Sequence, residues 1–355
     1  MALFGGPYVL WYWMMNDIFH KLLVLRMPRI GPVRYAELVR KYGDAATAAD
    51  AIGARDAAHA DSVMREMDRA ASLGIHYICD DSDLYPAALR AVKNHPPVIT
   101  ARGNLDTLRR RAVAMVGTRH ATAAGIGFMA DLANAFAARG IAVASGMAMG
   151  TDTGAHRGAL RADGCAQTIA VLAGGADYIW PLENESLYHE IIERGVVISE
   201  MPVGFVPVAT NFVQRNRLVA GVADKLIVGE ADLNSGSMTT ARFAMDIGRE
   251  IWAVPSHPSD SRAAGPNSLI SRGIAHLCSG YGDFFGCDDK NQPKKNNQKN
   301  QTQENILLDK LGTIPVSESV LADVVKKSIS EIKRDLVVLE LQGLVRKVDG
   351  GYVRM

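Results

Sequence analysis

The chain has 355 residues, of which 48% are hydrophobic and 22% charged, a composition typical of globular proteins with two or three domains. The formal net charge is only +1, so a site for a polyanion requires a local concentration of Arg and Lys. The four cysteines form no Cys-x-x-Cys pair, and no histidine pair has metal-ligand spacing. We therefore expect reduced thiols, no metal site and a cytoplasmic protein.

Residues 1–16 contain an uncharged stretch, MALFGGPYVLWYWMM, that lacks the basic start of a signal peptide and is too short to cross a bilayer. We expect a non-native or irregular extension, with translation starting at Met14 or Met15, and no membrane partner. The alternative is a short anchor that packs on the next domain.

Residues 17–90 show helical periodicity on both sides of an Ile30-Gly31-Pro32 turn, which predicts a small helical domain. The pattern resembles a helix-hairpin-helix or sterile-alpha-motif-like unit, in which such a turn can touch DNA phosphate through backbone N–H groups. The alternative is a packing domain that uses Gly31 only to turn the chain.

Residues 91–287 alternate between apolar runs and helical patterns. This alternation predicts an α/β fold, an extended Rossmann-like, doubly wound and mostly parallel sheet with helices on both faces. Ligands bind such sheets beyond the carboxyl ends of the strands, so the residues that follow each run matter most. The predicted strands are 112–117, 141–145, 168–175, 196–199, 225–229 and 250–255.

Residues 288–304 are polar throughout and predict a flexible linker. Residues 305–355 then predict three helices and a hairpin around Asp349-Gly350-Gly351, the arrangement of a winged-helix domain. The third helix sets Lys333 and Arg334 against three carboxylates, a poor balance for a helix in the DNA major groove. We expect a protein-contact or accessory role for this domain.

The loop after the first predicted strand carries Gly117, Thr118 and Arg119 and runs into a helix. There is no Gly-x-Gly-x-x-Gly at this strand end, and the second strand ends at Ser145-Gly146 without an acidic residue, so no NAD or other cofactor is expected. Backbone N–H groups near a helix start, together with one Arg, suit a phosphate.

In the next loop, Gly146, Gly150 and Gly154 allow the backbone to approach a ligand closely. Asp152 and His156 resemble catalytic residues, but we favour a helix N-cap role for Asp152. Without a Ser or Cys nucleophile nearby, His156 is poor evidence for hydrolysis.

Two further loops favour nucleic acid. Phe212 precedes Arg215, Asn216 and Arg217, and single strands bind where an aromatic ring stacks on bases beside guanidinium groups that hold phosphate. Packing in the core is the alternative for Phe212. The next loop, Ser235-Gly236-Ser237, opens a helix and offers a further anion cradle. None of these loops supplies a convincing nucleophile or general base, so no catalytic residue is predicted.

These residues resemble the DprA (Smf) family of bacterial DNA-processing proteins. The resemblance spans about 160 residues in the family's order and includes Gly117-Thr118-Arg119. The other matching segments are SGMAMGTDTGAHRGAL, TIAVLAGGADYIWPLENESLY, VVISEMPVG, FVQRNRLVAG, EADLNSGSMTTARFAMDIGREIWAVPS and GPNSLISRG.

The resemblance implies a non-enzymatic protein that binds single-stranded DNA independently of sequence, protects it on entry, dimerises, and loads the RecA recombinase in natural transformation. It places the DNA-contact Arg at Arg119 and the stacking ring at Phe212. The family's Arg-Asn-Arg signature falls on residues 215–217, and its dimer surface falls near Leu269 and Ile270.

The alternative function is that of a nucleotide-binding hydrolase of the nucleoside-monophosphate phosphoribohydrolase type. Those enzymes carry a carboxylate three residues after the Thr of a Gly-Gly-x-Gly-Thr loop. Here no carboxylate follows Thr240 until Asp246.

Overall fold

The computed structural model describes residues 17–163, 167–285, 306–312 and 314–355. The predictions for residues 1–16 and 288–304 lie outside these ranges. The chain divides into two compact units, Met1–Cys287 and Asp288–Met355, and each is described by itself.

The first unit is built on one nine-stranded sheet in the described chain, with the strand order β1-β2-β6-β5-β4-β3-β7-β8-β9. The strands from β6 to β9 run parallel, which confirms the predicted mostly parallel sheet. Each of the six predicted strands is present. Their bounds are β3 Ala112–Val116, β4 Ala142–Ser145, β5 Thr168–Val171, β6 Val196–Ser199, β7 Lys225–Val228 and β8 Glu250–Ala253, with β9 at His276–Leu277.

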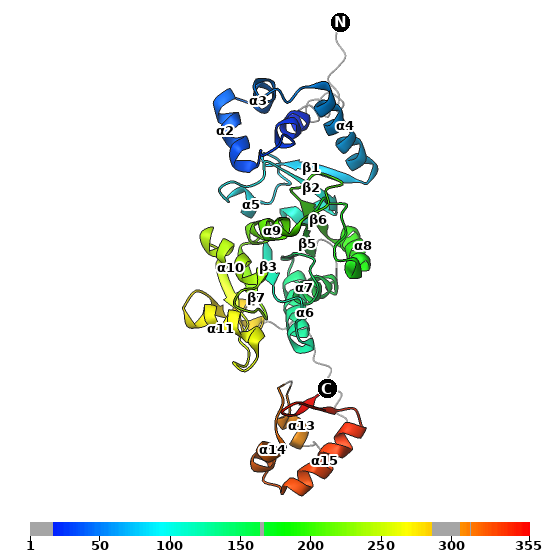
Figure 1. Cartoon of the computed structure of the whole chain (residues 1–355), viewed down its shortest axis with the longest axis vertical. Helices are drawn as coiled ribbons and strands as arrows, with labels where there is room; N and C mark the ends of the chain where they lie inside the picture. The colour runs from blue at the N-terminus through cyan, green and yellow to red at the C-terminus, as the bar shows by residue number, and fades with distance from the viewer. Residues whose placement is uncertain (1–16, 164–166, 286–305, 313) are drawn as a thin grey trace. The chain divides into compact units, whose positions relative to one another are not determined.

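Helices cover both faces of the sheet. Alternate residues of each strand point to opposite faces, so each strand contributes side chains to both cores. Val113 and Met115 of β3 pack in the core with α6 and α7, whereas its Ala114 packs with α9 and α10. Figure 1 shows α9, α10 and α11 on one side of the strands and α6, α7 and α8 on the other. The helices are α6 Ala123–Ala137, α7 Thr151–Leu160, α8 Glu185–Arg194, α9 Ala209–Gly221, α10 Gly236–Asp246, α11 Ala264–Ser271 and α12 Gly282–Phe285.

The N-terminal segment departs from the all-helical expectation at β1 (Ile75–Cys79). This strand pairs antiparallel with β2 (Val98–Gly103), which pairs antiparallel with β6. Ile75, Ile78 and Cys79 are buried, so β1 takes its place from tertiary packing that a five-residue run does not reveal. Helical structure is found at 17–25, α2 Pro32–Tyr42, α3 Ala45–Ala51, α4 Ala57–Ser72 and α5 Ala87–Arg90.

A second correction concerns residues 199–221, which we expected to be a strand-end loop. Helix α9 occupies Ala209–Gly221, because Leu218 and Val219 pack on the sheet and Asn211 accepts a hydrogen bond from the backbone N–H of Val208 at the helix start. Phe212 therefore lies on a helix.

The second unit contains the three helices and the hairpin expected of a winged helix. Its core is formed by buried residues that include Leu321, Ile332, Leu336 and Tyr352. The outward side of α15 exposes Val337, Val338 and Leu341, the last with 84% of its surface accessible. The elements are α13 Ile306–Lys310, α14 Glu318–Val325, α15 Ile329–Leu341, β10 Val345–Val348 and β11 Gly351–Arg354.

Cys79 and Cys278 are buried free thiols, whereas Cys165 and Cys287 lie outside the described residues. Within the described ranges, no group of three His, Cys, Asp or Glu side chains is placed to hold a metal ion. None of the described helices is long and apolar enough to cross a membrane.

Candidate nucleic-acid interface

A cleft of about 630 Å³ lies at the carboxyl ends of β3 and β4, between the starts of α7, α9 and α10. This is where the strand order reverses, since β4 and β7 flank β3 on opposite sides. The cleft brings together every predicted DNA-binding residue except Arg217. Those residues are Gly117, Thr118, Arg119, Gly146, Phe212, Arg215, Asn216, Ser235, Gly236 and Ser237.

The rim of the cleft is formed by Arg119, Trp180 and Phe212. The exposed Arg119 guanidinium lies 5.0 Å from the centre of the Trp180 ring. The Trp180 and Phe212 rings are 4.4 Å apart between centroids and tilted by 60°, and both side chains are partly exposed. The rim therefore offers two aromatic faces beside one accessible cation.

Sequence reasoning did not single out Trp180. It follows β5 in the segment TIAVLAGGADYIWP, so the rule that ligand contacts follow parallel strands applied to it as well. Eight residues separate β5 from Trp180, so the sequence did not indicate that Trp180 lies at the strand end. The loop folds back and brings the indole against Phe212.

The floor of the cleft is formed by Gly146, Asp152 and Arg215. Arg215 is 7% exposed, and its Nη1 donates to the carbonyl oxygens of Gly146, at 2.7 Å, and Val171. The Asp152 carboxylate accepts from the backbone N–H of Gly146 at 3.1 Å. A Cβ on Gly146 would lie 2.6 Å from Arg215 Nη2, so a larger residue here would force the guanidinium to shift. Arg215 is thus held within the protein and supports the cleft from below.

Burial is the main cause of the shifted pKa values of the two charged residues in the floor. It raises the pKa of Asp152 to about 6, and the Arg215 charge opposes that rise. Burial lowers the pKa of Arg215 to about 10, against the effect of Asp152. The two groups stabilise each other's charged form in a site that disfavours both charges.

The structural role expected for Asp152 takes a different form from an N-cap. Gly150, with φ +76°, is the N-cap of α7, and Asp152 lies in its first turn with its carboxylate directed back to Gly146 and Ala148. His156 is fully buried, and its Nδ1 lies 2.7 Å from Thr168 Oγ1. Burial lowers the pKa of His156 to about 3, so its ring is neutral at pH 7.

The start of α10 forms a further wall of the cleft. Ser235 is its N-cap and accepts from Met238 N at 3.4 Å, while Ser237 Oγ donates to Gly117 O at 2.7 Å. Asn216 Nδ2 donates to Gly236 O at 3.2 Å and ties α9 to α10. The positive end of the α10 dipole therefore faces the cleft, as the sequence indicated.

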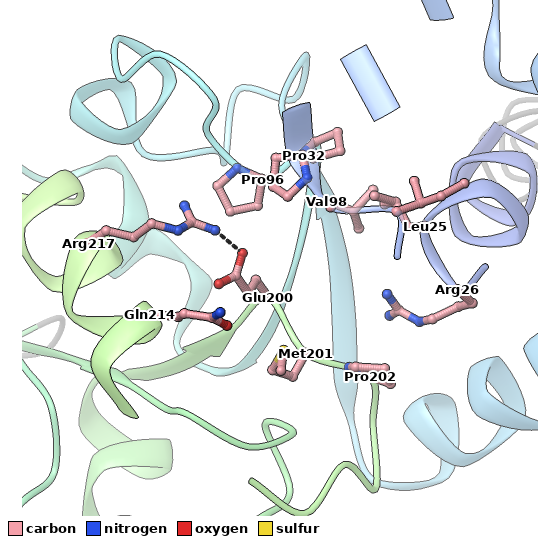
Figure 2. Close-up of a pocket in the computed structure, with 13 residues that line it drawn as sticks. Leu25, Arg26, Pro32, Pro96, Val98, Glu200, Met201, Pro202, Gln214 and Arg217 are labelled. Atoms are coloured by element: carbon pink, nitrogen blue, oxygen red, sulfur yellow. Dashed lines mark hydrogen bonds and ion pairs between the residues drawn. The ribbon is translucent and has the colours of Figure 1, made fainter. Parts of the chain in front are cut away.

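Arg217 lies on the other side of α9 and forms an ion pair with Glu200. It lines a second cavity of about 470 Å³ between the N-terminal helical segment and the sheet. Figure 2 shows this ion pair opposite Pro96 and Pro32. The structure thus separates Arg217 from the predicted residues that line the cleft.

The residues expected near a dimer surface differ in exposure. Leu269 is 4% exposed and packs in the core, and Ile270 is partly buried against the same core. A contact surface in this region would use the side chains around them.

Chemically, the cleft is suited to binding. Asp152 is the one carboxylate among the described residues that line it, and its hydrogen bonds and burial against Arg215 hold it in the floor. The chain is therefore an α/β protein joined to a winged helix. An aromatic rim, an accessible guanidinium and a helix N-terminus at a switch point are the features that suit a phosphate-bearing ligand.

Comparisons with known proteins give the family. Residues 76–286 match the family model described as DNA recombination-mediator protein A, and residues 291–351 match that of the DprA winged helix domain. The chain belongs to the DprA/Smf family.

Individual relatives agree. A Mycobacterium tuberculosis relative named for DprA is 40% identical over 264 residues, which cover 69% of this chain and 65% of that protein. This chain therefore spans slightly less than two thirds of the length of that relative. Protein Smf of Escherichia coli is 32% identical over 291 residues, covering 79% of this chain and 77% of that protein.

Two solved structures share the fold. DNA processing protein A (DprA) of Streptococcus pneumoniae aligns with a TM-score of 0.59 at 28% identity, covering 80% of this chain and 98% of that chain. The Helicobacter pylori DNA processing protein A aligns with a TM-score of 0.54 at 29% identity, covering 59% of this chain and 93% of that chain. The latter structure concerns a single-stranded DNA binding mode.

Proposed function

We propose that this protein binds single-stranded DNA in the cleft, independently of base sequence and without catalysis. The observation that carries the proposal is the rim, where Arg119, Trp180 and Phe212 place a cation beside two aromatic faces. Every base has a face that can stack on an aromatic ring, so this recognition tolerates any sequence. The guanidinium contacts phosphate, and the α10 N-terminus adds N–H donors.

Membership of the family supports a proposal for the role within the cell. The chain matches the family of DNA recombination-mediator protein A, and the structure of the Helicobacter pylori relative concerns single-stranded DNA binding, which supports that substrate. We extend the proposal to a homodimer that protects incoming single strands in transformation and loads RecA, in the cytoplasm. Two experiments test these partners. The molecular mass of the protein in solution, measured with and without DNA, tests the dimer, and RecA filament formation on single strands coated with this protein tests RecA loading.

A hydrolase of the phosphoribohydrolase type is the competing function. It requires a free carboxylate beside the bound nucleotide, and Asp152 is engaged by Gly146 and Ala148 in the floor of the cleft. An assay for free-base release from nucleoside monophosphates decides between the two, and catalytic turnover would refute the binding-only proposal.

The direct test is a titration of fluorescent oligonucleotides of mixed sequence, single- and double-stranded, at several salt concentrations. We expect single strands to bind more tightly than duplexes, with affinity falling as salt rises because phosphate contacts release counterions. Equal affinity for both forms, or a strong preference for one base sequence, would contradict the proposal.

A further inference from the structure

Helix α9 separates two cavities. Phe212, Asn216 and Val219 line the cleft, whereas Gln214 and Arg217 line the second cavity. At 100° per residue these two sets project from different sides of the helix, so a single sequence segment serves both cavities. Val213 lines the cleft, is 49% exposed and precedes Gln214 in the helix. A ligand could therefore pass over the surface of α9 at these two residues from one cavity to the other.

The second cavity is lined mainly by apolar residues and has a polar cluster at one side. Its volume of about 470 Å³ is in the range of small-molecule sites. Four proline rings contribute flat apolar surfaces, and Figure 2 shows Pro32 and Pro96 across from Glu200 and Arg217. The prolines are Pro32, Pro96, Pro97 and Pro202.

The polar cluster consists of Glu200, Gln214 and Arg217. Glu200 and Arg217 form an ion pair with side chains 17% and 27% exposed. Gln214 is exposed, and among the described residues its side-chain amide has no hydrogen-bond partner. A carboxylate, a guanidinium and an amide together offer hydrogen-bond acceptors and donors. The edge of every nucleobase also carries such groups, so the cluster suits a base without requiring a particular one.

The charges of the cavity favour a base over a phosphate. Arg217 is paired with Glu200, and Arg26 forms two hydrogen bonds of 2.7 Å with Glu66. Neither guanidinium therefore brings an uncompensated positive charge to the cavity. Beyond Arg26, segment 27–41 carries four basic residues and one acidic residue, so a polyanion backbone is favoured just outside the cavity.

We propose that the second cavity receives a nucleobase of the same single strand that occupies the cleft, after the strand crosses α9 at Val213 and Gln214. The base packs between proline rings, and its edge meets Glu200, Gln214 and Arg217. The turn at Ile30-Gly31-Pro32 forms a wall of this cavity, so the N-terminal helical segment extends the DNA footprint. This inference rests on the proposed function of the cleft.

The test is a length series of oligothymidylates, from 4 to about 20 nucleotides, titrated against the full chain. We expect affinity to rise about tenfold once the strand is long enough to reach the second cavity, beyond the ordinary statistical gain. Gln214→Ala and the neutral pair Glu200→Gln/Arg217→Gln should remove that rise and leave short oligonucleotides unaffected. Gln214 is exposed, so its variant keeps the fold intact even if the double variant does not.

The control is Arg161→Gln, which removes an exposed Arg paired with Asp131 away from both cavities and should retain the rise. If Gln214→Ala and the double variant Glu200→Gln/Arg217→Gln kept the full length dependence, the inference would be overturned. Equal weakening of binding at all oligonucleotide lengths in these variants would overturn it as well. If the wild-type chain bound no oligonucleotide of any length, the proposed function of the cleft would fail instead. A 4-thiothymidine should cross-link to residues of the second cavity only from oligonucleotides that are long enough to show the rise in affinity.

Discussion

The rim and the floor of the cleft contain the same residue type in opposite circumstances. Arg119 on the rim is exposed, with its guanidinium over the Trp180 ring, while Arg215 in the floor is buried, hydrogen-bonded to two carbonyls and set against Asp152. A buried charge requires partners within the protein, whereas an exposed one remains free to meet a ligand. The difference supports the proposal that the rim binds the ligand, and it assigns to the floor the role of holding the supporting loops in place.

The largest effect should come from the floor. We expect Arg215→Ala to lower the free energy of unfolding by about 3–5 kcal/mol, because it leaves Asp152 buried without its opposing charge. Urea titrations measure this loss, and Arg119→Ala should stay within about 0.5 kcal/mol of the unchanged protein. Equal stabilities of the two variants would remove the distinction between rim and floor.

The floor variant also has a pH signature. Arg215 opposes the burial that raises the Asp152 pKa to about 6, so its removal raises that pKa further. Because the neutral acid is tolerated in the folded state, the stability lost in Arg215→Ala should be smaller at pH 5 than at pH 8. A loss that is the same at both pH values would mean that the Asp152 charge is not its cause.

The next effect concerns the aromatic part of the rim. Phe212→Ala should weaken single-strand binding by about 1–3 kcal/mol and leave the fold in place, because the ring is partly exposed beside Trp180. Phe212→Trp should retain binding, since a larger ring still stacks. A thermal melt and a titration on the same sample separate this outcome from core packing, for which stability would fall by about 3–5 kcal/mol with binding by the folded fraction unchanged.

A smaller effect is expected from the rim cation. Arg119→Ala should lower single-strand affinity and reduce the slope of log affinity against log salt by about 0.7, the value for one lost phosphate contact on a single strand. Titrations at four or more salt concentrations give the slope. Arg161→Gln serves as a charge-matched control, and an unchanged slope for Arg119→Ala would show that this side chain does not meet phosphate.

The smallest effect should follow removal of residues 288–355. The winged helix is a separate compact unit, and α15 exposes Val337, Val338 and Leu341 where a DNA-reading helix carries polar or basic residues. We expect single-strand affinity within about twofold of the full chain, well under the tenfold that corresponds to 1.4 kcal/mol. A folded truncated protein that binds only at background level would place the DNA site on the winged helix.

Much of the fold could be predicted because its signals are local. Continuous apolar runs identified six parallel strands, and helical periodicity with a glycine hairpin identified the winged helix. The errors arose where packing outweighed local pattern. β1 is a short run stabilised by pairing with β2, and α9 was mistaken for a loop because its first turns carry polar residues beside the cleft.

The residue types of the candidate site could be predicted from the sequence. An anion site needs glycines, hydroxyls and arginines, and these residues follow the ends of the predicted strands. Only the tertiary structure determines which arginine side chain is exposed and which is buried. Residues 215 and 217 are two apart on a helix, so one enters the floor and the other turns to Glu200 and the second cavity. Trp180 likewise joins the rim only because its loop folds back onto Phe212, a long-range contact that no local pattern encodes.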